Sequence, residues 1–289
     1  MNVGFIGLGL MGRPMAQHLG ADGHQLHLWA RRPQTLDTFR NGQARLHDSP
    51  AAVAAQSEVL ITMVADAPDV EEVLFGSNGV VKGAQIGLTV IDMSTIGPAA
   101  ARDIGARLAA QQIHFLDAPV SGGETGAINA SLTIMVGGDA AVFERMKPLL
   151  QQMGKLVSLI GGCGAGQVAK ACNQILTGVG IVAVAEAMAF AKKSGVNPAR
   201  VREAMLGGFA YSRILENHGQ RMLDGNFKPG FKGWMHRKDL RIVVEEARQL
   251  GLALPSSAAT AQMFSALVDA GLGDEDSIAV LKLIEARGA

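Results

Sequence analysis

A glycine pattern at the start of the chain is suited to binding a diphosphate. Residues 7–12 read Gly-Leu-Gly-Leu-Met-Gly and follow directly on the apolar run Val3–Ile6. In such a pattern Gly7 permits a tight turn, Gly9 lets the backbone approach a pyrophosphate, and Gly12 lets the next helix pack on the strand. The sequence therefore predicts a dinucleotide site. Its contacts are expected from Gly7, Leu8, Gly9, Leu10, Met11 and Gly12.

A second glycine-rich segment could bind a carboxylate. Residues 117–127 read Asp-Ala-Pro-Val-Ser-Gly-Gly-Glu-Thr-Gly-Ala. Within it Ser121, Gly122 and Gly123 offer a hydroxyl and successive backbone N–H groups, which together suit an anion. Two glycines after a strand also make an ordinary turn. Two anion-binding loops at one sheet edge would place a cofactor beside an acidic substrate.

Lys170 and Asn173 could act on that substrate. They are three residues apart in a helical segment, so they share a helix face. A partly desolvated lysine beside a nicotinamide could donate the proton that carbonyl reduction needs. The alternative is that Lys170 is a solvated surface lysine.

Strand ends supply the other candidate cofactor contacts. The strand ending at Trp29 is followed by Arg31 and Arg32, with no carboxylate in the position typical of NAD sites. This favours NADP(H), with NAD(H) left open, because guanidinium groups bind a 2′-phosphate; the alternative is that both arginines are solvated. Later strand ends offer Val64, Ala65 and Thr95. Thr95 could bond the nicotinamide half of the cofactor, or Ser94 or Thr95 could simply start the next helix.

These residues need a sheet to position them. Short β-like runs alternate with helical patterns up to about residue 160, which predicts a mostly parallel, doubly wound α/β domain of the Rossmann type with ligands at the carboxyl ends of its strands. The expected strands are Val3–Ile6, Gln25–Ala30, Glu58–Val64, Thr89–Met93, Ile113–Leu116, Leu132–Val136 and Leu156–Ile160.

The second half of the chain is predicted to be all-α. A long helix over about Gly166–Ser194 is apolar on most sides, so we expect it to be buried along much of its length. We expect a Rossmann domain over 1–162, this joining helix over 163–194 and a helical domain over 195–289. Further helices are expected at about Pro198–Leu206, Ser212–Leu223, Trp234–Leu250, Ser256–Ala270 and Asp276–Ala286.

Composition narrows the class of protein. The 26 basic and 26 acidic side chains cancel, which predicts no general attraction to nucleic acid or to an anionic membrane. The apolar stretch Ile175–Ala185 is expected to be too short to span a bilayer. Cys163 and Cys172 are the only cysteines and lack metal-ligand spacing, so we expect a reduced, cytoplasmic protein without a metal.

Five segments together resemble the β-hydroxyacid dehydrogenase family. They read GFIGLGLMGRPMAQHL, DMSTIGP, DAPVSGGETGA, GAGQVAKACNQ and HRKDL, and they occur in order over nearly the whole chain. The resemblance implies reversible, metal-free oxidation of short 3-hydroxy carboxylates with NAD(P). It also implies a helical C-terminal domain that supports a homodimer or homotetramer. It makes Lys170 the catalytic lysine, Asn173 its orienting partner, Ser121–Gly123 the carboxylate loop, and Thr95 and Lys238 cofactor contacts.

Two departures and one further motif refine this expectation. Relatives often carry Asn-Arg where this chain has Ala30-Arg31, and some carry Asn-Asn where it has Asn173-Gln174. The segment Phe227–Lys232, FKPGFK, is most similar to members that reduce tartronate semialdehyde to glycerate. Oxidation of 3-hydroxyisobutyrate, and reduction of glyoxylate or succinic semialdehyde, remain alternatives within the family. A non-catalytic cofactor-binding scaffold and an imine reductase are alternatives of other kinds, both typical of relatives that lack the lysine.

Overall fold

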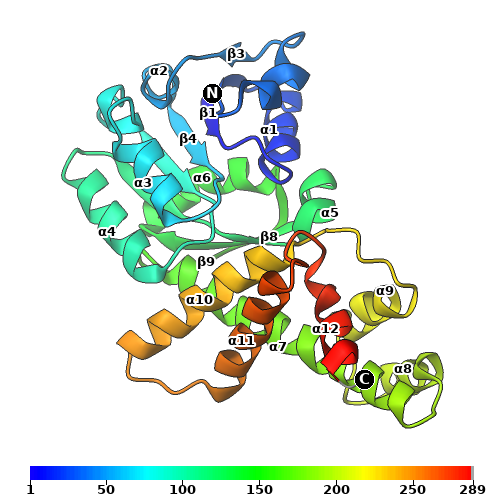
Figure 1. The fold of residues 1–289 in the computed structure, drawn as a ribbon. Helices are drawn as coiled ribbons and strands as arrows, with labels where there is room; N and C mark the ends of the chain where they lie inside the picture. Colours follow the sequence, from blue (N-terminus) through cyan, green and yellow to red (C-terminus); the bar gives the residue numbers. More distant parts are fainter. Residues whose placement is uncertain (288–289) are drawn as a thin grey trace. The chain divides into compact units, whose positions relative to one another are not determined.

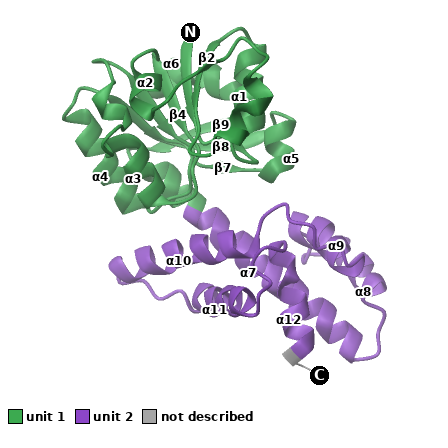
Figure 2. Ribbon diagram, turned by 45° about the horizontal axis from the view of Figure 1, so that its top comes forward, with its two compact units in different colours: residues 1–170 green, residues 171–289 purple. Residues whose placement is uncertain are grey.

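Short runs of buried apolar residues form a nine-stranded sheet in the first part of the chain. The computed structural model describes residues 1–287, and its chain divides into two units, Met1–Lys170 and Ala171–Ala289 (Figure 2). The strands, some of which are labelled in Figure 1, are β1 (Asn2–Ile6), β2 (Gln25–Trp29), β3 (Arg45–Leu46), β4 (Val59–Thr62), β5 (Thr89–Asp92), β6 (His114–Asp117), β7 (Val120–Ser121), β8 (Leu132–Gly138) and β9 (Gly154–Gly161).

The order of the strands confirms the doubly wound fold. They run β3-β2-β1-β4-β5-β6-β8-β7, with β9 paired to β8, and the first six are parallel. The chain passes from β1 outward to β3 and returns to β4 on the other side of β1. Such a reversal is where open α/β sheets bind ligands.

Alternation along the strands separates two apolar cores. Val3 and Phe5 of β1 face a cluster that includes α1 and α6, whereas Ile6 faces a cluster that includes α2, α3 and α4. Because successive side chains of a strand point to opposite faces, both faces of the sheet are covered. The helices of this unit are α1 (Gly12–Ala21), α2 (Pro50–Ala54), α3 (Ala67–Phe75), α4 (Pro98–Ala109), α5 (Gly123–Ile128) and α6 (Ala140–Gln151), with 3-10 turns η1 (Pro33–Phe39) and η2 (Val80–Lys82).

The second unit is helical. Its core packs the long helix α7 against α10 and α11, with Ile181, Leu240 and Phe264 among the buried residues. The helix α8 begins as predicted, because Asn197 caps it by accepting a bond from the Ala199 N–H. The helices are α7 (Ala165–Lys193), which starts in the first unit, α8 (Pro198–Leu206), α9 (Gly219–Leu223), α10 (Gly233–Gln249), α11 (Pro255–Asp269) and α12 (Val280–Arg287), with short turns η3 (Ile214–His218) and η4 (Ser277–Ala279).

The structure modifies two expectations about α7. Buried residues recur along its length from Gly166 to Ala191, as expected, but they cover only part of its circumference, because Leu176 and Phe190 are 73% and 76% exposed. The apolar stretch is also longer than 175–185: α7 has 29 residues and a window of mean hydropathy 1.7, which by length and composition alone could cross a membrane. A core helix of a globular domain passes the same test, and α7 contributes to the core of the second unit.

Candidate active site

Two of the three glycines in the predicted turn leave no room for a side chain. Gly7 has φ +101°, and a Cβ there would lie 2.1 Å from the Met63 carbonyl oxygen. A Cβ on Gly12 would lie 2.0 Å from the carbonyl oxygen of Gly7, whereas one on Gly9 would meet nothing within 4 Å. Gly7 and Gly12 are therefore required by the fold itself. Gly9 is instead the position where a bare backbone borders open space.

The start of α1 is also suited to an anion. No side chain caps this end of the helix, and its first turn carries no acidic residue, within the part of the chain that the structure describes. Such a helix end presents backbone N–H groups and a partial positive charge. Leu8 is buried, Leu10 is half exposed and Met11 is the residue before α1. The predicted contacts from this turn are consistent with the phosphates of a dinucleotide.

The other predicted cofactor residues follow strands that end in one row. Ile6 pairs with Thr62, Thr62 with Asp92, and Asp92 with Asp117. The segments after these residues, which contain the glycine turn, Val64, Ala65 and Thr95, therefore leave the sheet at the same edge.

Ser94 ties two of these segments together. Its hydroxyl oxygen accepts a bond of 2.9 Å from the backbone N–H of Val64, and its own N–H donates to the Asp92 carboxylate at 3.2 Å. The same carboxylate accepts a bond of 2.7 Å from the Thr62 hydroxyl. Ser94 thus fixes two loops, and the helix start near Pro98 is instead preceded by Gly97. Thr95 follows Ser94 and is partly exposed.

Arg31 lies at this edge but already has an ion-pair partner. Trp29, the last residue of β2, pairs with Ile6, so Arg31 and Arg32 follow the strand at the level of the glycine turn. The Arg31 guanidinium lies 2.8 Å from the Asp69 carboxylate of α3, and the Arg31 side chain is 77% exposed. Both arginines are accessible, and a bound anion would compete with Asp69 for Arg31.

The predicted carboxylate loop is a strand followed by a helical turn. Ser121 ends β7, which pairs with the first residues of β8. Gly122 has φ +136° and Gly123 has φ +62°, conformations that side chains disfavour, and Gly123 starts α5. The far end of α5 is held by His18 of α1, whose Nε2 lies 3.1 and 2.9 Å from the carbonyl oxygens of Ala127 and Ile128.

Lys170 comes from the first turns of α7, which a buried carboxylate anchors. Asp117 accepts bonds from the N–H groups of Gly164 (2.7 Å) and Gln167 (2.9 Å). Burial raises the pKa of Asp117 to about 6, although these two bonds act in the opposite direction. Lys170 lies one turn after Gln167 and is 7% exposed, so it is not the solvated surface lysine of the alternative interpretation.

Asn173 and Lys238 belong to the second unit, where other side chains connect them. The Asn173 amide donates to the Gln174 side-chain oxygen at 2.7 Å, and Gln174 donates to the buried carboxylate of Asp239. Asp239 in turn lies 3.0 Å from the Lys238 ammonium group. Gln174 therefore links Asn173 to Asp239 through side-chain hydrogen bonds. The orienting role of Asn173 and the cofactor contact of Lys238 stay predictions.

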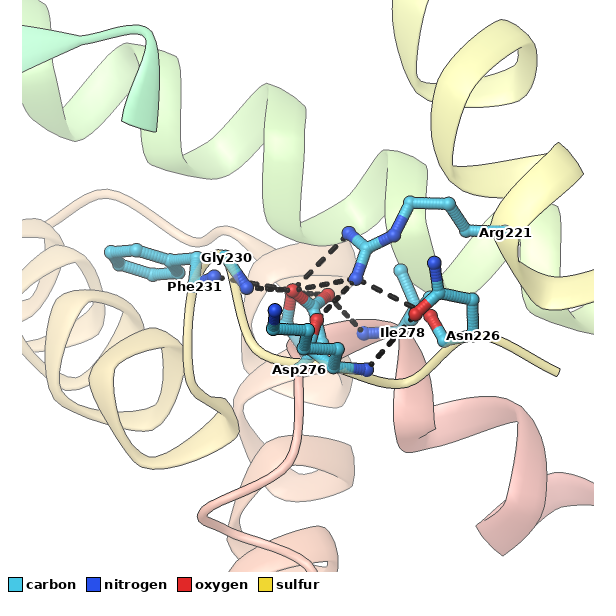
Figure 3. Close-up of polar contacts among 8 residues, drawn as sticks. Arg221, Asn226, Gly230, Phe231, Asp276 and Ile278 are labelled. Carbon is cyan, nitrogen blue, oxygen red and sulfur yellow. Dashed lines mark hydrogen bonds and ion pairs between the residues drawn. The ribbon is translucent and has the colours of Figure 1, made fainter. Parts of the chain in front are cut away.

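A buried carboxylate also shapes the segment Phe227–Lys232 (Figure 3). Asp276, 1% exposed, accepts bonds from the backbone N–H groups of Gly230 (2.7 Å) and Phe231 (3.1 Å). The Arg221 guanidinium lies 3.2 Å from the same carboxylate and donates to the Lys228 carbonyl at 2.6 Å. The conformation of this segment is thus set by residues outside it.

The geometry of the described residues also bears on metal sites and reactive thiols. Residues 1–287 contain no group of three or more His, Cys, Asp or Glu side chains that could hold a metal ion. Both cysteines are free, and burial raises the pKa of Cys163 to about 11. The glycine turn and the start of α1 at the strand-end row offer backbone N–H groups to an anion.

Sequence reasoning missed the buried polar residues that hold this arrangement. Asp117, Gln167, Gln174 and Asp239 are all nearly inaccessible. The burial of an acid at a strand end or of a glutamine in a helix cannot be predicted from the periodicity of apolar residues. The one available hint was that both glutamines flank Lys170 at helical spacing.

Comparison with known proteins agrees with this geometry. Residues 2–162 match the NAD binding domain of 6-phosphogluconate dehydrogenase, and residues 164–284 match the NAD-binding domain of NADP-dependent 3-hydroxyisobutyrate dehydrogenase. The chain is 45% identical over 285 residues to 2-hydroxy-3-oxopropionate reductase of Escherichia coli, covering 99% of this chain and 97% of that protein. It is 38% identical to L-threonate dehydrogenase of Cupriavidus necator, covering 98% and 95%.

A solved structure extends the likeness to three dimensions. The crystal structure of a 3-hydroxyisobutyrate dehydrogenase from Salmonella typhimurium has a TM-score of 0.87 and 34% identity, covering 98% of this chain and 99% of that one. The chain belongs to the β-hydroxyacid dehydrogenase family, and it is an NAD(P)-dependent oxidoreductase that acts on a CH–OH group.

Proposed function

Since the chain belongs to this family, we propose that it reduces a short semialdehyde carboxylate to the hydroxy acid, with tartronate semialdehyde as its substrate and NADPH as its preferred cofactor. The observation that carries the reaction type is the buried Lys170 on a helix anchored to the row of strand ends. The identity of 45% to a 2-hydroxy-3-oxopropionate reductase supports the substrate. Exposed Arg31 and Arg32 support the cofactor.

The residues of this chain would hold the cofactor at the sheet edge. The glycine turn and the N-terminus of α1 bind its pyrophosphate, Arg31 and Arg32 its 2′-phosphate, and Val64, Ala65 and Thr95 its remaining length. A bound nicotinamide supplies the hydride for the aldehyde carbon. This geometry fits because Gly9 borders open space and α1 has no side-chain cap among the described residues.

The chain itself binds the substrate and supplies the proton. Ser121, Gly122 and Gly123 bind the substrate carboxylate through a hydroxyl and backbone N–H groups. The Lys170 ammonium group donates a proton to the oxygen that becomes the alcohol, and its charge stabilises the negative charge developing there. Asn173, one helical turn further on, orients Lys170.

A second substrate is supported by a specific comparison. The Salmonella structure with a TM-score of 0.87 is named as a 3-hydroxyisobutyrate dehydrogenase, so that hydroxy acid is the alternative. One methyl or hydroxyl group changes selectivity by only about 1–3 kcal/mol in a pocket, so both substrates need to be measured.

Initial rates decide between these substrates. The panel is tartronate semialdehyde, glyoxylate, succinic semialdehyde and methylmalonate semialdehyde, each with NADPH and NADH. We expect the highest kcat/KM for tartronate semialdehyde with NADPH. A higher value for methylmalonate semialdehyde would favour the 3-hydroxyisobutyrate alternative, and no turnover of any of the four would contradict the proposal.

We also propose that the chain forms a homodimer or homotetramer through α7. Leu176, Ala183 and Phe190 are exposed and follow one another at intervals of seven residues, so they form an apolar stripe on one side of the helix. Replacing Leu176 and Phe190 with Glu should lower the mass measured by light scattering. A wild-type protein that is monomeric at micromolar concentration would contradict this.

A further inference from the structure

We propose that Gln167 is a positioning residue that holds Thr95 and Lys170 in register. Its side-chain amide binds the backbone on both sides of Thr95, while its own helix carries Lys170 one turn further on. The inference rests on the proposed function, because it takes Thr95 as a cofactor contact and Lys170 as the proton donor.

Two hydrogen bonds form this clamp. The Gln167 Nε2 atom donates to the Ser94 carbonyl oxygen at 2.8 Å. The Gln167 Oε1 atom accepts from the Ile96 N–H at 3.2 Å. Ser94 and Ile96 are the two neighbours of Thr95, so a single planar amide fixes the peptide units before and after it. A primary amide suits this position because one end donates and the other accepts.

These two bonds are held in place because the backbone of Gln167 is itself hydrogen-bonded to another element. Its backbone N–H donates to the buried Asp117 carboxylate at 2.9 Å, and its side chain is 1% exposed. The adjacent Gly166 allows close packing, since a Cβ there would lie 2.4 Å from the Met135 carbonyl oxygen. This turn of α7 therefore has little freedom to slide or rotate.

The consequence concerns the relative placement of two groups from distant parts of the sequence. Thr95 follows β5 and Lys170 lies in α7, and Gln167 joins the two elements by side-chain hydrogen bonds. A displacement of about 1 Å between reacting groups can lower a rate about 100-fold, so this link matters beyond stability.

The test replaces Gln167 with methionine, which has a similar length but makes neither bond. Asp139→Ala is the matched control. Asp139 caps α6 by accepting from the Val142 N–H at 2.9 Å, and it follows β8, whose last residues Gly137 and Gly138 pair with Asp117 and Leu116 of β6. Both variants lose a structural hydrogen bond close to Asp117, but only Gln167→Met removes the bonds to Ser94 and Ile96 on either side of Thr95.

The first measurement needs neither turnover nor cofactor. In Gln167→Met we expect hydrogen exchange at the Ile96 amide to rise about tenfold, as the loss of one hydrogen bond predicts. We expect wild-type exchange at this amide in Asp139→Ala. Wild-type exchange at Ile96 in Gln167→Met would overturn the proposal.

The second measurement is kinetic, at a temperature where both variants are fully folded. Gln167→Met should lower kcat about 10- to 100-fold and weaken NADPH binding, measured by cofactor fluorescence, while Asp139→Ala should change neither. The fold decrease in kcat caused by Thr95→Val should be smaller in the Gln167→Met background than in the wild type. A kcat within twofold of the control would overturn the positioning role.

Failure of the proposed function gives a different pattern. In that case the wild type would turn over none of the four semialdehydes. The exchange at Ile96 and the affinity for NADPH would still report on whether Gln167 holds the Thr95 segment.

Discussion

The guanidinium of Arg31 lies 2.8 Å from the carboxylate of Asp69, at the end of β2 where a 2′-phosphate would bind. The arginine is thus shared between an internal acid and the proposed ligand. Its side chain is 77% exposed, so the ion pair itself contributes little stability. The pair connects cofactor preference to a residue on α3.

Arg31→Ala should therefore lower kcat/KM with NADPH about 10- to 100-fold, the range expected for a lost charge-assisted bond to phosphate. Its effect with NADH should be small. Asp69→Asn should raise kcat/KM with NADPH by up to about fivefold, because an exposed ion pair is worth about 0.2–1 kcal/mol. Equal effects on the two cofactors, measured by initial rates, would contradict a role in phosphate binding.

Gly9 and Gly12 should respond differently to alanine. The Cβ of Gly9→Ala meets no atom within 4 Å, so we expect an unchanged Tm. The same methyl group should obstruct the pyrophosphate and raise the Kd for NADPH about 10- to 100-fold. In Gly12→Ala the Cβ would lie 2.0 Å from the Gly7 carbonyl oxygen, so this variant should lose stability, by about 1–3 kcal/mol. Gly9→Ala with wild-type NADPH affinity would argue against binding at this turn.

Lys170→Ala should separate chemistry from binding. We expect kcat to fall about 10²- to 10⁴-fold, as for the loss of a general acid, while the Kd for NADPH changes little. Lys155→Ala is the control, because that lysine is exposed on β9 of the same unit. Turnover near the wild-type rate in Lys170→Ala would refute the role of the lysine.

Asp117 should contribute more to the stability of the fold at low pH than at neutral pH. Burial raises its pKa from 3.8 to about 6 in the folded protein. As the pH falls from about 6 to about 4, the folded state takes up a proton that the unfolded chain does not, so this group stabilises the fold progressively, by up to about 3 kcal/mol. Above about pH 6 the carboxylate is charged in both states, and its burial cost is fully present.

Urea unfolding of the wild type and Asp117→Asn measures this contribution. The free energy of unfolding of the wild type, relative to the variant, should rise as the pH is lowered from about 7 to about 4. A constant difference over this range would mean that Asp117 titrates at its ordinary pKa. NMR titration of the Asp117 carboxyl resonance would measure the pKa of this group directly.

Much of the fold follows from apolar periodicity and helix signals, and the exceptions have physical causes. The longer buried strands were predicted to within a few residues, but β3 and β7 have only two residues each and leave no pattern. The expected helix over Ser212–Leu223 begins with a π-helical turn at Ile214–His218. Arg202 donates hydrogen bonds to the Leu215 and Glu216 carbonyl groups there. This tertiary contact could not be predicted from the sequence.

The candidate site was less predictable than the fold. Glycines and a lysine stand out because their chemistry is tied to spacing. Gln167 does not, since a helical glutamine is usually solvated, and its role depends on Ser94 and Ile96, which are more than seventy positions away.

The row formed by Ile6, Thr62, Asp92 and Asp117 marks the boundary between the buried strands and the loops that follow them. The strands supply a fixed platform, and the proposed cofactor contacts of the first unit lie in the segments that follow β1, β2, β4 and β5. A lineage could therefore exchange one connecting loop for another and acquire a new hydroxy acid without rebuilding the interior. Diversification of catalysts on this scaffold would then proceed loop by loop, with hydride chemistry inherited intact.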